Sequence, residues 1–136
     1  MRKVLEGEAE RESTVEAEQA PFAVETIGTG ARVTVIAVHG QADLHTAPEL
    51  RSAIAGAIDA GARSLVVDLS EASFIDSMTL GVLLGAVKRL RPSGGTVSVV
   101  CTDPHIRRIF EITLLDRVFS LHDDRDAALD HADGEA

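Results

Sequence analysis

Short apolar runs alternate along this chain with segments whose hydrophobic residues recur every three or four positions. Apolar runs of that length are typical of buried strands, and the longer spacing is typical of helices packed on a sheet. The strand-like runs lie at residues 22–27, 32–39, 65–69, 96–100 and 118–121. Helical spacing follows at 46–60, at 77–91, after Asp103-Pro104, and from Asp123 or Asp124 through Leu129. The pattern predicts an α/β domain with a mixed central β-sheet of about five strands and about four helices.

The first predicted helix fixes the direction of two strands. Thr46-Ala47-Pro48-Glu49 has the spacing of a capping box, and Gly61 supplies the expected stop after Ala60. A strand-helix-strand crossover makes the flanking strands parallel, so the loops that follow them share one end of the sheet. Sites in open α/β sheets lie beyond the carboxyl ends of such strands. We therefore expect Asp43 and Ser77 to be neighbours.

The run from Phe74 to Gly81 places a serine where the second helix begins. The first amides of a helix lack intrahelical partners and carry partial positive charge, so a phosphoryl group on Ser77 would be held there. The simpler alternative is that Ser77 only caps the helix, which is worth about 1 kcal/mol. The neighbouring carboxylate of Asp76 either orients the Ser77 hydroxyl or caps the helix itself, and the sequence leaves both roles open.

Two glycines weaken the second helix. On a helical wheel one face is apolar and is expected to pack on the sheet; it holds Leu80, Leu83, Leu84, Val87 and Leu90. The opposite face holds Met78, Gly81, Val82, Gly85 and Arg89. Each glycine costs roughly 1 kcal/mol relative to alanine. Either another protein docks on this face, with Met78 and Val82 as apolar contacts, or the glycines let the helix approach another element of its own domain.

Charge is concentrated at the two ends of the chain. The formal net charge is −9, and residues 1–20 and 121–136 account for nearly all of it. The middle lacks the basic patch that nucleic acids require, so we expect no nucleic-acid binding. We expect residues 1–20 to be an acidic, disordered segment, residues 21–130 to form the single domain, and residues 131–136 to be a flexible tail.

The remaining chemistry excludes several classes of protein. Cys101 is the only cysteine, so no intrachain disulfide forms, and we expect it to be a small buried apolar group. The scattered histidines lack metal-ligand spacing, and we expect neither a metal site nor a cofactor. No apolar run is long enough for a signal peptide or a membrane span, so we expect a cytoplasmic protein without membrane contact. The chain also lacks a nucleophile elbow and a phosphate-binding loop, and we expect no enzyme.

The stretch from Leu65 to Arg91, with its Asp76-Ser77 step and its Leu80-Gly81-Val82-Leu83-Leu84-Gly85, resembles the STAS family. This is the domain of anti-sigma factor antagonists and of sulfate transporter tails, and the resemblance runs from about Phe22 to Leu129. Gly40-Gln41-Ala42-Asp43 is similar to the family's Gly-Glu-X-Asp, whose aspartate lies close to an acceptor serine. The chain departs from the family pattern at Met78 and Thr79, where a second serine or threonine and a glycine are expected.

The resemblance implies a function. In that family a kinase that is also an anti-sigma factor phosphorylates the serine, and phosphorylation abolishes binding. It implies that Ser77 is the phosphoacceptor, that Asp76, Asp43 and Thr79 lie beside it, and that the partner contacts Met78, Gly81, Val82 and Gly85. The chain would then be an anti-sigma factor antagonist in a partner switch that controls transcription. ATP and Mg²⁺ would be bound by the kinase, and a serine phosphatase would restore the free serine.

An alternative keeps the fold without the switch. The chain would then be a scaffold or accessory subunit of a transporter or signalling assembly. The departures at Met78 and Thr79 favour this alternative slightly.

Overall fold

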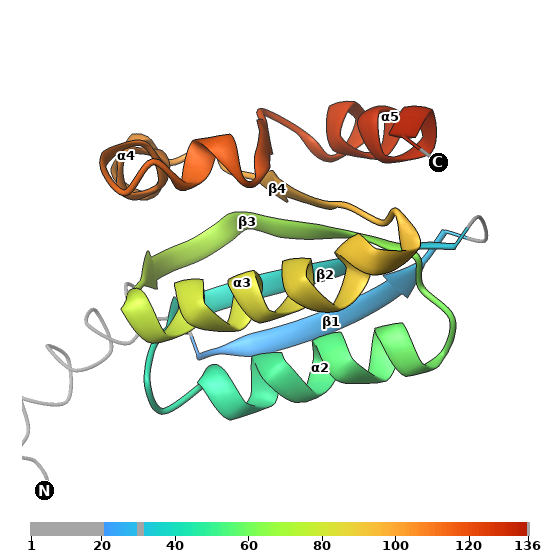
Figure 1. Ribbon diagram of the computed structural model, residues 1–136. Helices are drawn as coiled ribbons and strands as arrows, with labels where there is room; N and C mark the ends of the chain where they lie inside the picture. The colour runs from blue at the N-terminus through green and yellow to red at the C-terminus, as the bar shows by residue number, and fades with distance from the viewer. Residues whose placement is uncertain (1–20, 30–31, 136) are drawn as a thin grey trace, which may run out of the picture.

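The protein is described here from a computed structural model, which covers residues 21–29 and 32–135. Five strands form one sheet in the order β1-β2-β3-β4-β5 (Figure 1). The strands are β1 (Ala23–Gly28), β2 (Val33–Ala42), β3 (Ser64–Ile75), β4 (Val97–Val100) and β5 (Ser120–His122). Strand β1 is antiparallel to β2, and the remaining neighbours are parallel. The prediction of a mixed sheet of about five strands is confirmed.

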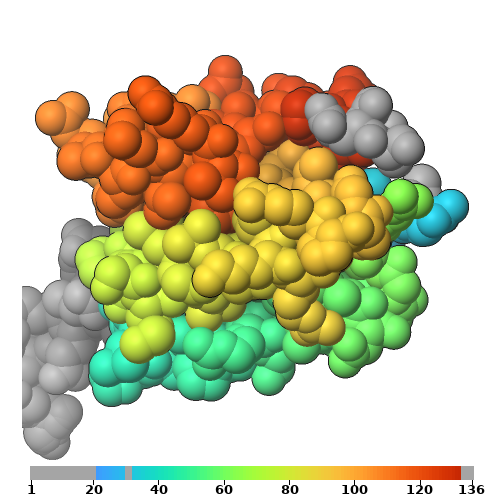
Figure 2. Space-filling model, viewed as in Figure 1, coloured from blue at the N-terminus to red at the C-terminus, as the bar shows by residue number. Residues whose placement is uncertain are grey.

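Four α-helices follow the strands in the described part of the chain. They are α2 (Ala47–Asp59), α3 (Ser77–Leu90), α4 (Pro104–Ile112) and α5 (Arg125–Glu135). Two short 3₁₀ turns, η1 (Arg91–Ser93) and η2 (Leu115–Arg117), follow α3 and α4. Helices α2 and α3 lie in neighbouring bands on one face of the molecule, turquoise to green and yellow-green to yellow in Figure 2. The α/β fold class is confirmed.

Two apolar clusters hold the layers together, one on each face of the sheet. Alternate residues of a strand point to opposite faces, so Ile36 packs in the larger cluster with α2 and α3, while Val35 packs in the smaller one. Ala128 and Ala132 of α5 cover the smaller cluster and are fully buried. Because both faces of the central strands are covered, these strands are almost continuously apolar, which is typical of parallel sheets.

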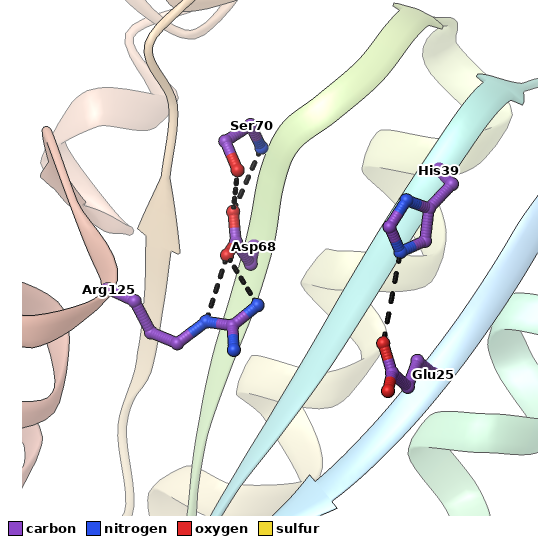
Figure 3. A network of polar contacts seen from close by, with 5 residues as sticks. All are labelled: Glu25, His39, Asp68, Ser70 and Arg125. Atoms are coloured by element: carbon purple, nitrogen blue, oxygen red, sulfur yellow. Dashed lines mark hydrogen bonds and ion pairs between the residues drawn. The ribbon is translucent and has the colours of Figure 1, made fainter.

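A polar network also joins α5 to β3 (Figure 3). The carboxylate of Asp68, whose side chain is only 7% exposed, accepts bonds of 3.0 and 2.9 Å from the Arg125 guanidinium. Its other oxygen accepts bonds from the backbone amide and the hydroxyl of Ser70. Burial by itself raises the pKa of Asp68, but these bonds to Ser70 and Arg125 outweigh burial and lower it. Asp68 therefore stays ionised and fixes α5 on the sheet.

Several predicted boundaries differ from the structure. Strand β3 continues past Leu69 to Ile75, because β2 also continues and the two strands stay paired through two irregularities in register. Strand β5 begins at Ser120, two residues later than the run at 118–121 suggested. Helix α5 continues past Leu129 to Glu135, so residues 131–135 are helical where a flexible tail was expected. The predicted disorder of residues 1–20 lies outside the described residues.

The capping box predicted before α2 does not form. The Thr46 hydroxyl makes no capping bond and instead accepts a 2.8 Å hydrogen bond from the Asp43 backbone amide. The Asp43 carboxylate accepts bonds from the amides of His45 and Thr46. The Asp43 side chain thus forms a turn in the loop between β2 and α2, and this turn is present instead of the predicted capping box.

Candidate functional site

The site lies where β2 and β3 end. These strands are parallel and end in register, with Ala42 opposite Ile75. Asp43 and Asp76 are the next residues, and each begins a loop or helix at the same edge of the sheet. The structure therefore brings Asp43 to the edge where α3 begins, as the parallel crossover predicted.

Asp76, rather than Ser77, caps helix α3. Its backbone is extended, and its carboxylate accepts a 3.0 Å hydrogen bond from the Thr79 amide. Of the two roles left open for Asp76, the structure supports capping, and the interpretation of Ser77 as the N-cap is wrong. Ser77 is the first residue of the helix, and it is exposed.

Thr79 is a buried link between α3 and β2. Its residue exposure is 0%, and its hydroxyl donates a 2.7 Å hydrogen bond to the carbonyl oxygen of Ala42. The same hydroxyl lies 3.1 Å from the Asp76 carboxylate. A kinase has no access to a hydroxyl buried in this way, so Thr79 positions the edge that carries Ser77.

The outer face of α3 differs in part from the helical wheel. Leu80, Leu83 and Leu90 are buried as predicted. Val82, however, is only 7% exposed, and the prediction that it projects outward is wrong. Helix α2 packs beside α3, and Val82 lies with Ile54 and Ala55 of α2 in the lining between the two helices, which a wheel for one helix cannot show.

A groove of about 410 Å³ runs between α2 and α3. It is lined by Arg51, Ile54, Ala55, Gly81, Val82, Gly85, Ala86 and Arg89. An added Cβ atom at Gly81 or Gly85 would meet nothing within 4 Å outside its own helix. The explanation that these glycines permit close packing inside the domain is therefore wrong. They instead leave the surface hollow, which fits the approach of another molecule.

Three exposed apolar side chains border the same edge. Leu44 is 58% exposed in the loop before α2, Phe74 is 47% exposed near the end of β3, and Met78 is 41% exposed beside Ser77. We call these three residues the apolar rim. Sequence reasoning found Met78 but missed Leu44 and Phe74. Phe74 alternates with the buried Ile75 at the end of β3, a strand pattern that lies beyond the predicted end of this strand at Leu69.

Other candidates lie away from this edge. Cys101 is buried as predicted, and burial raises the pKa of its thiol to about 11, which suppresses the reactive thiolate. The described residues contain no group of three or more side chains that could hold a metal ion. None of the described helices is both long and apolar enough to cross a membrane.

Comparison with known proteins agrees with this geometry. Residues 25–128 match the STAS domain. The chain belongs to the STAS domain family. The match includes the edge with Asp43, the capped start of α3 and the groove, so the predicted resemblance is confirmed.

Individual STAS relatives cover most of the chain. BtrV of Bordetella bronchiseptica, named as a candidate anti-sigma factor antagonist, is 31% identical over 94 residues, which are 69% of this chain and 81% of BtrV. An anti-sigma-B factor antagonist of Staphylococcus aureus is 32% identical over 78 residues, 57% of this chain and 72% of that protein. The crystal structure of an anti-sigma factor antagonist from Mycobacterium paratuberculosis superposes with a TM-score of 0.72 at 30% identity, covering 83% of this chain and 95% of the other.

Proposed function

We propose that this STAS protein is an anti-sigma factor antagonist that binds an anti-sigma factor kinase when Ser77 is free and is released when Ser77 is phosphorylated. The observation that carries the proposal is an exposed serine at the first position of α3, directly beside the apolar rim. The STAS relatives named as antagonists support the binding role. The kinase and phosphatase steps rest on the motif at Asp76-Ser77 and on this exposure.

Phosphorylation at this position suits a switch that leaves the fold intact. Ser77 is exposed, so a phosphoryl group needs no rearrangement of the core, and the first-turn amides of α3 favour its charge. A phosphoserine carries about −1.5 to −2 charges at neutral pH. This charge would lie next to Met78 of the rim and would have to be desolvated when a partner covers the rim. Docking would therefore become unfavourable.

The chain acts in this scheme as substrate and ligand. ATP and Mg²⁺ belong to the kinase, and a separate serine phosphatase removes the phosphate. The described part of the site holds two carboxylates, Asp43 and Asp76, and both are engaged in hydrogen bonds to backbone amides. Their role here is to hold the loop after β2 and the start of α3 in place at the edge of the sheet that carries Ser77.

A direct test is to incubate the protein with its cognate kinase, ATP and Mg²⁺ and to map the phosphate by mass spectrometry. We expect label on Ser77 and none on Thr79, because only the first hydroxyl is exposed. Ser77→Ala should remove the label while keeping the complex with the kinase. Label on another residue, or a labelled Ser77→Ala variant, would contradict the assignment of Ser77.

The second candidate function is a STAS scaffold that does not switch. Thr79, a residue that departs from the family pattern, ties the start of α3 to β2, which favours a rigid edge. In that case the kinase would leave Ser77 unlabelled, and Ser77→Asp would bind the partner as tightly as the unmodified chain.

A further inference from the structure

The groove between α2 and α3 has an apolar floor and a basic border. Ile54, Val82 and Ala86 form part of its lining, and the charged residues in the lining are the arginines Arg51 and Arg89. Arg51 is exposed and forms no ion pair or hydrogen bond with any residue that the structure describes. Arg89 lies 3.3 Å from Asp59, but both side chains are largely exposed, and such a pair is weak. The groove therefore suits a segment that is partly apolar and acidic.

The described chain begins at the end of the sheet where α2 and α3, the helices that line the groove, also begin. Strand β1 runs antiparallel to β2, so Ala23 pairs with His39, close to the carboxyl end of β2. Phe22 packs against the large cluster that also contains α2 and α3. Residues 1–20 are thus tethered at the same edge as Ser77 and the first turns of both helices.

Residues 1–20 have the complementary charge. They contain six glutamates against three basic residues, and all six glutamates fall within residues 6–18, where Arg11 is the only cation. Val15 adds an apolar side chain among them. The segment is also long enough to reach the groove from the point where the described chain begins. Gly85 lies about 12 Å along α3 from Ser77 at 1.5 Å per residue, and eight extended residues span roughly 26 Å.

We propose that residues 6–18 bind in the groove between α2 and α3 and cover Gly81 and Gly85, with glutamates next to Arg51 and Arg89. Tethering gives this contact an effective concentration in the millimolar range, so an intrinsically weak interaction suffices to occupy the groove for a substantial part of the time. The contact is electrostatic and exposed, and salt should therefore weaken it.

The consequence for regulation rests on the proposed function. If the anti-sigma factor docks over the same groove, the acidic segment competes with it, and the apparent dissociation constant rises as the reciprocal of the unoccupied fraction. Half occupancy gives an increase of about twofold. The segment would then set a threshold for capture of the partner, independently of Ser77.

The contact can be measured on the full chain without any partner. A nitroxide label is attached to Ser13→Cys; Cys101 is 1% exposed and is not expected to react under mild conditions. We expect the amide NMR signals of Gly81 and Gly85 to lose at least about half of their intensity at low salt. The loss should disappear in 1 M NaCl, where the screening length is about 3 Å. It should also disappear when the six glutamates of residues 6–18 are changed to glutamine.

Arg51→Glu provides the reciprocal test, and Arg108→Glu is its matched control. Arg108 is likewise an exposed helical arginine that forms no ion pair or hydrogen bond with the described residues, but it lies on α4, away from the groove. We expect Arg51→Glu to abolish the broadening and Arg108→Glu to leave it unchanged. Unbroadened glycine signals at low salt, or broadening that survives the glutamine variant, would overturn the proposal. Because no kinase is present, either result leaves the proposed function of Ser77 untouched.

Discussion

The buried hydroxyl of Thr79 provides a quantitative test of how the start of α3, which carries Ser77, is connected to β2. Thr79→Val keeps the shape of the side chain but removes the donor to the Ala42 carbonyl, which is 2.7 Å away in a residue that is only 1% exposed. Leaving a buried carbonyl without its partner costs about 1–3 kcal/mol. For a domain of this size, each kcal/mol lowers the melting temperature by roughly 3–6 °C.

Thr79→Ser is the matched control, because it keeps the hydroxyl and removes only a methyl group. Urea unfolding followed by circular dichroism, with equal slopes for all variants, gives the free energies of unfolding. We expect Thr79→Val to lose more stability than Thr79→Ser. If serine were at least as damaging as valine, the hydroxyl would not be the stabilising feature, and the link between α3 and β2 would have to be reconsidered.

Three further predictions concern stability and binding. Since the pKa of Asp68 is lowered in the folded state from its usual 3.8, its stabilising contribution is complete above about pH 4 and is lost as pH falls through the lowered pKa. Asp68→Asn should flatten the pH dependence of the free energy of unfolding in this acidic range. An unchanged slope would contradict the claim that the bonds to Ser70 and Arg125 stabilise the ionised Asp68 carboxylate. Gly81→Ala and Gly85→Ala should each stabilise the domain by up to about 1 kcal/mol, because the added methyl groups meet open space, while weakening anti-sigma factor binding measured by calorimetry; a loss of stability would show that the space is filled. Phe74→Ser should weaken that binding while the variant still folds cooperatively, since the side chain is 47% exposed; a folded variant with unchanged affinity would remove Phe74 from the interface.

The parts of the site that follow from chain direction could be predicted from the sequence. A helical crossover makes β2 and β3 parallel, and that alone brings Asp43 to the edge where Ser77 begins a helix. The Asp76-Ser77 sequence and the pattern of leucines after it predicted that α3 begins at about Ser77, and the structure has it begin there. These features depend on local pattern and handedness, which a sequence carries directly.

The parts that depend on packing between elements could not be predicted in this way. A wheel for α3 places Val82 outward, but only the position of α2 shows that this side is covered. The capping box predicted at Thr46 does not form because the Asp43 carboxylate accepts from the Thr46 amide, which the Glu49 side chain would bind in a capping box, and the Thr46 hydroxyl accepts from the Asp43 amide. Leu44 and Phe74 are ordinary apolar residues in the sequence, and only the fold places both at the edge of the sheet where α3 begins.

The central claim is that a free Ser77 permits docking and a phosphorylated Ser77 prevents it. The most direct measurement is the dissociation constant of the anti-sigma factor complex, by calorimetry, for the unphosphorylated protein and for the same protein phosphorylated on Ser77. We predict at least a tenfold weaker complex after phosphorylation, which corresponds to about 1.4 kcal/mol, with Ser77→Ala binding like the unphosphorylated form. Equal dissociation constants for the two forms would contradict the claim.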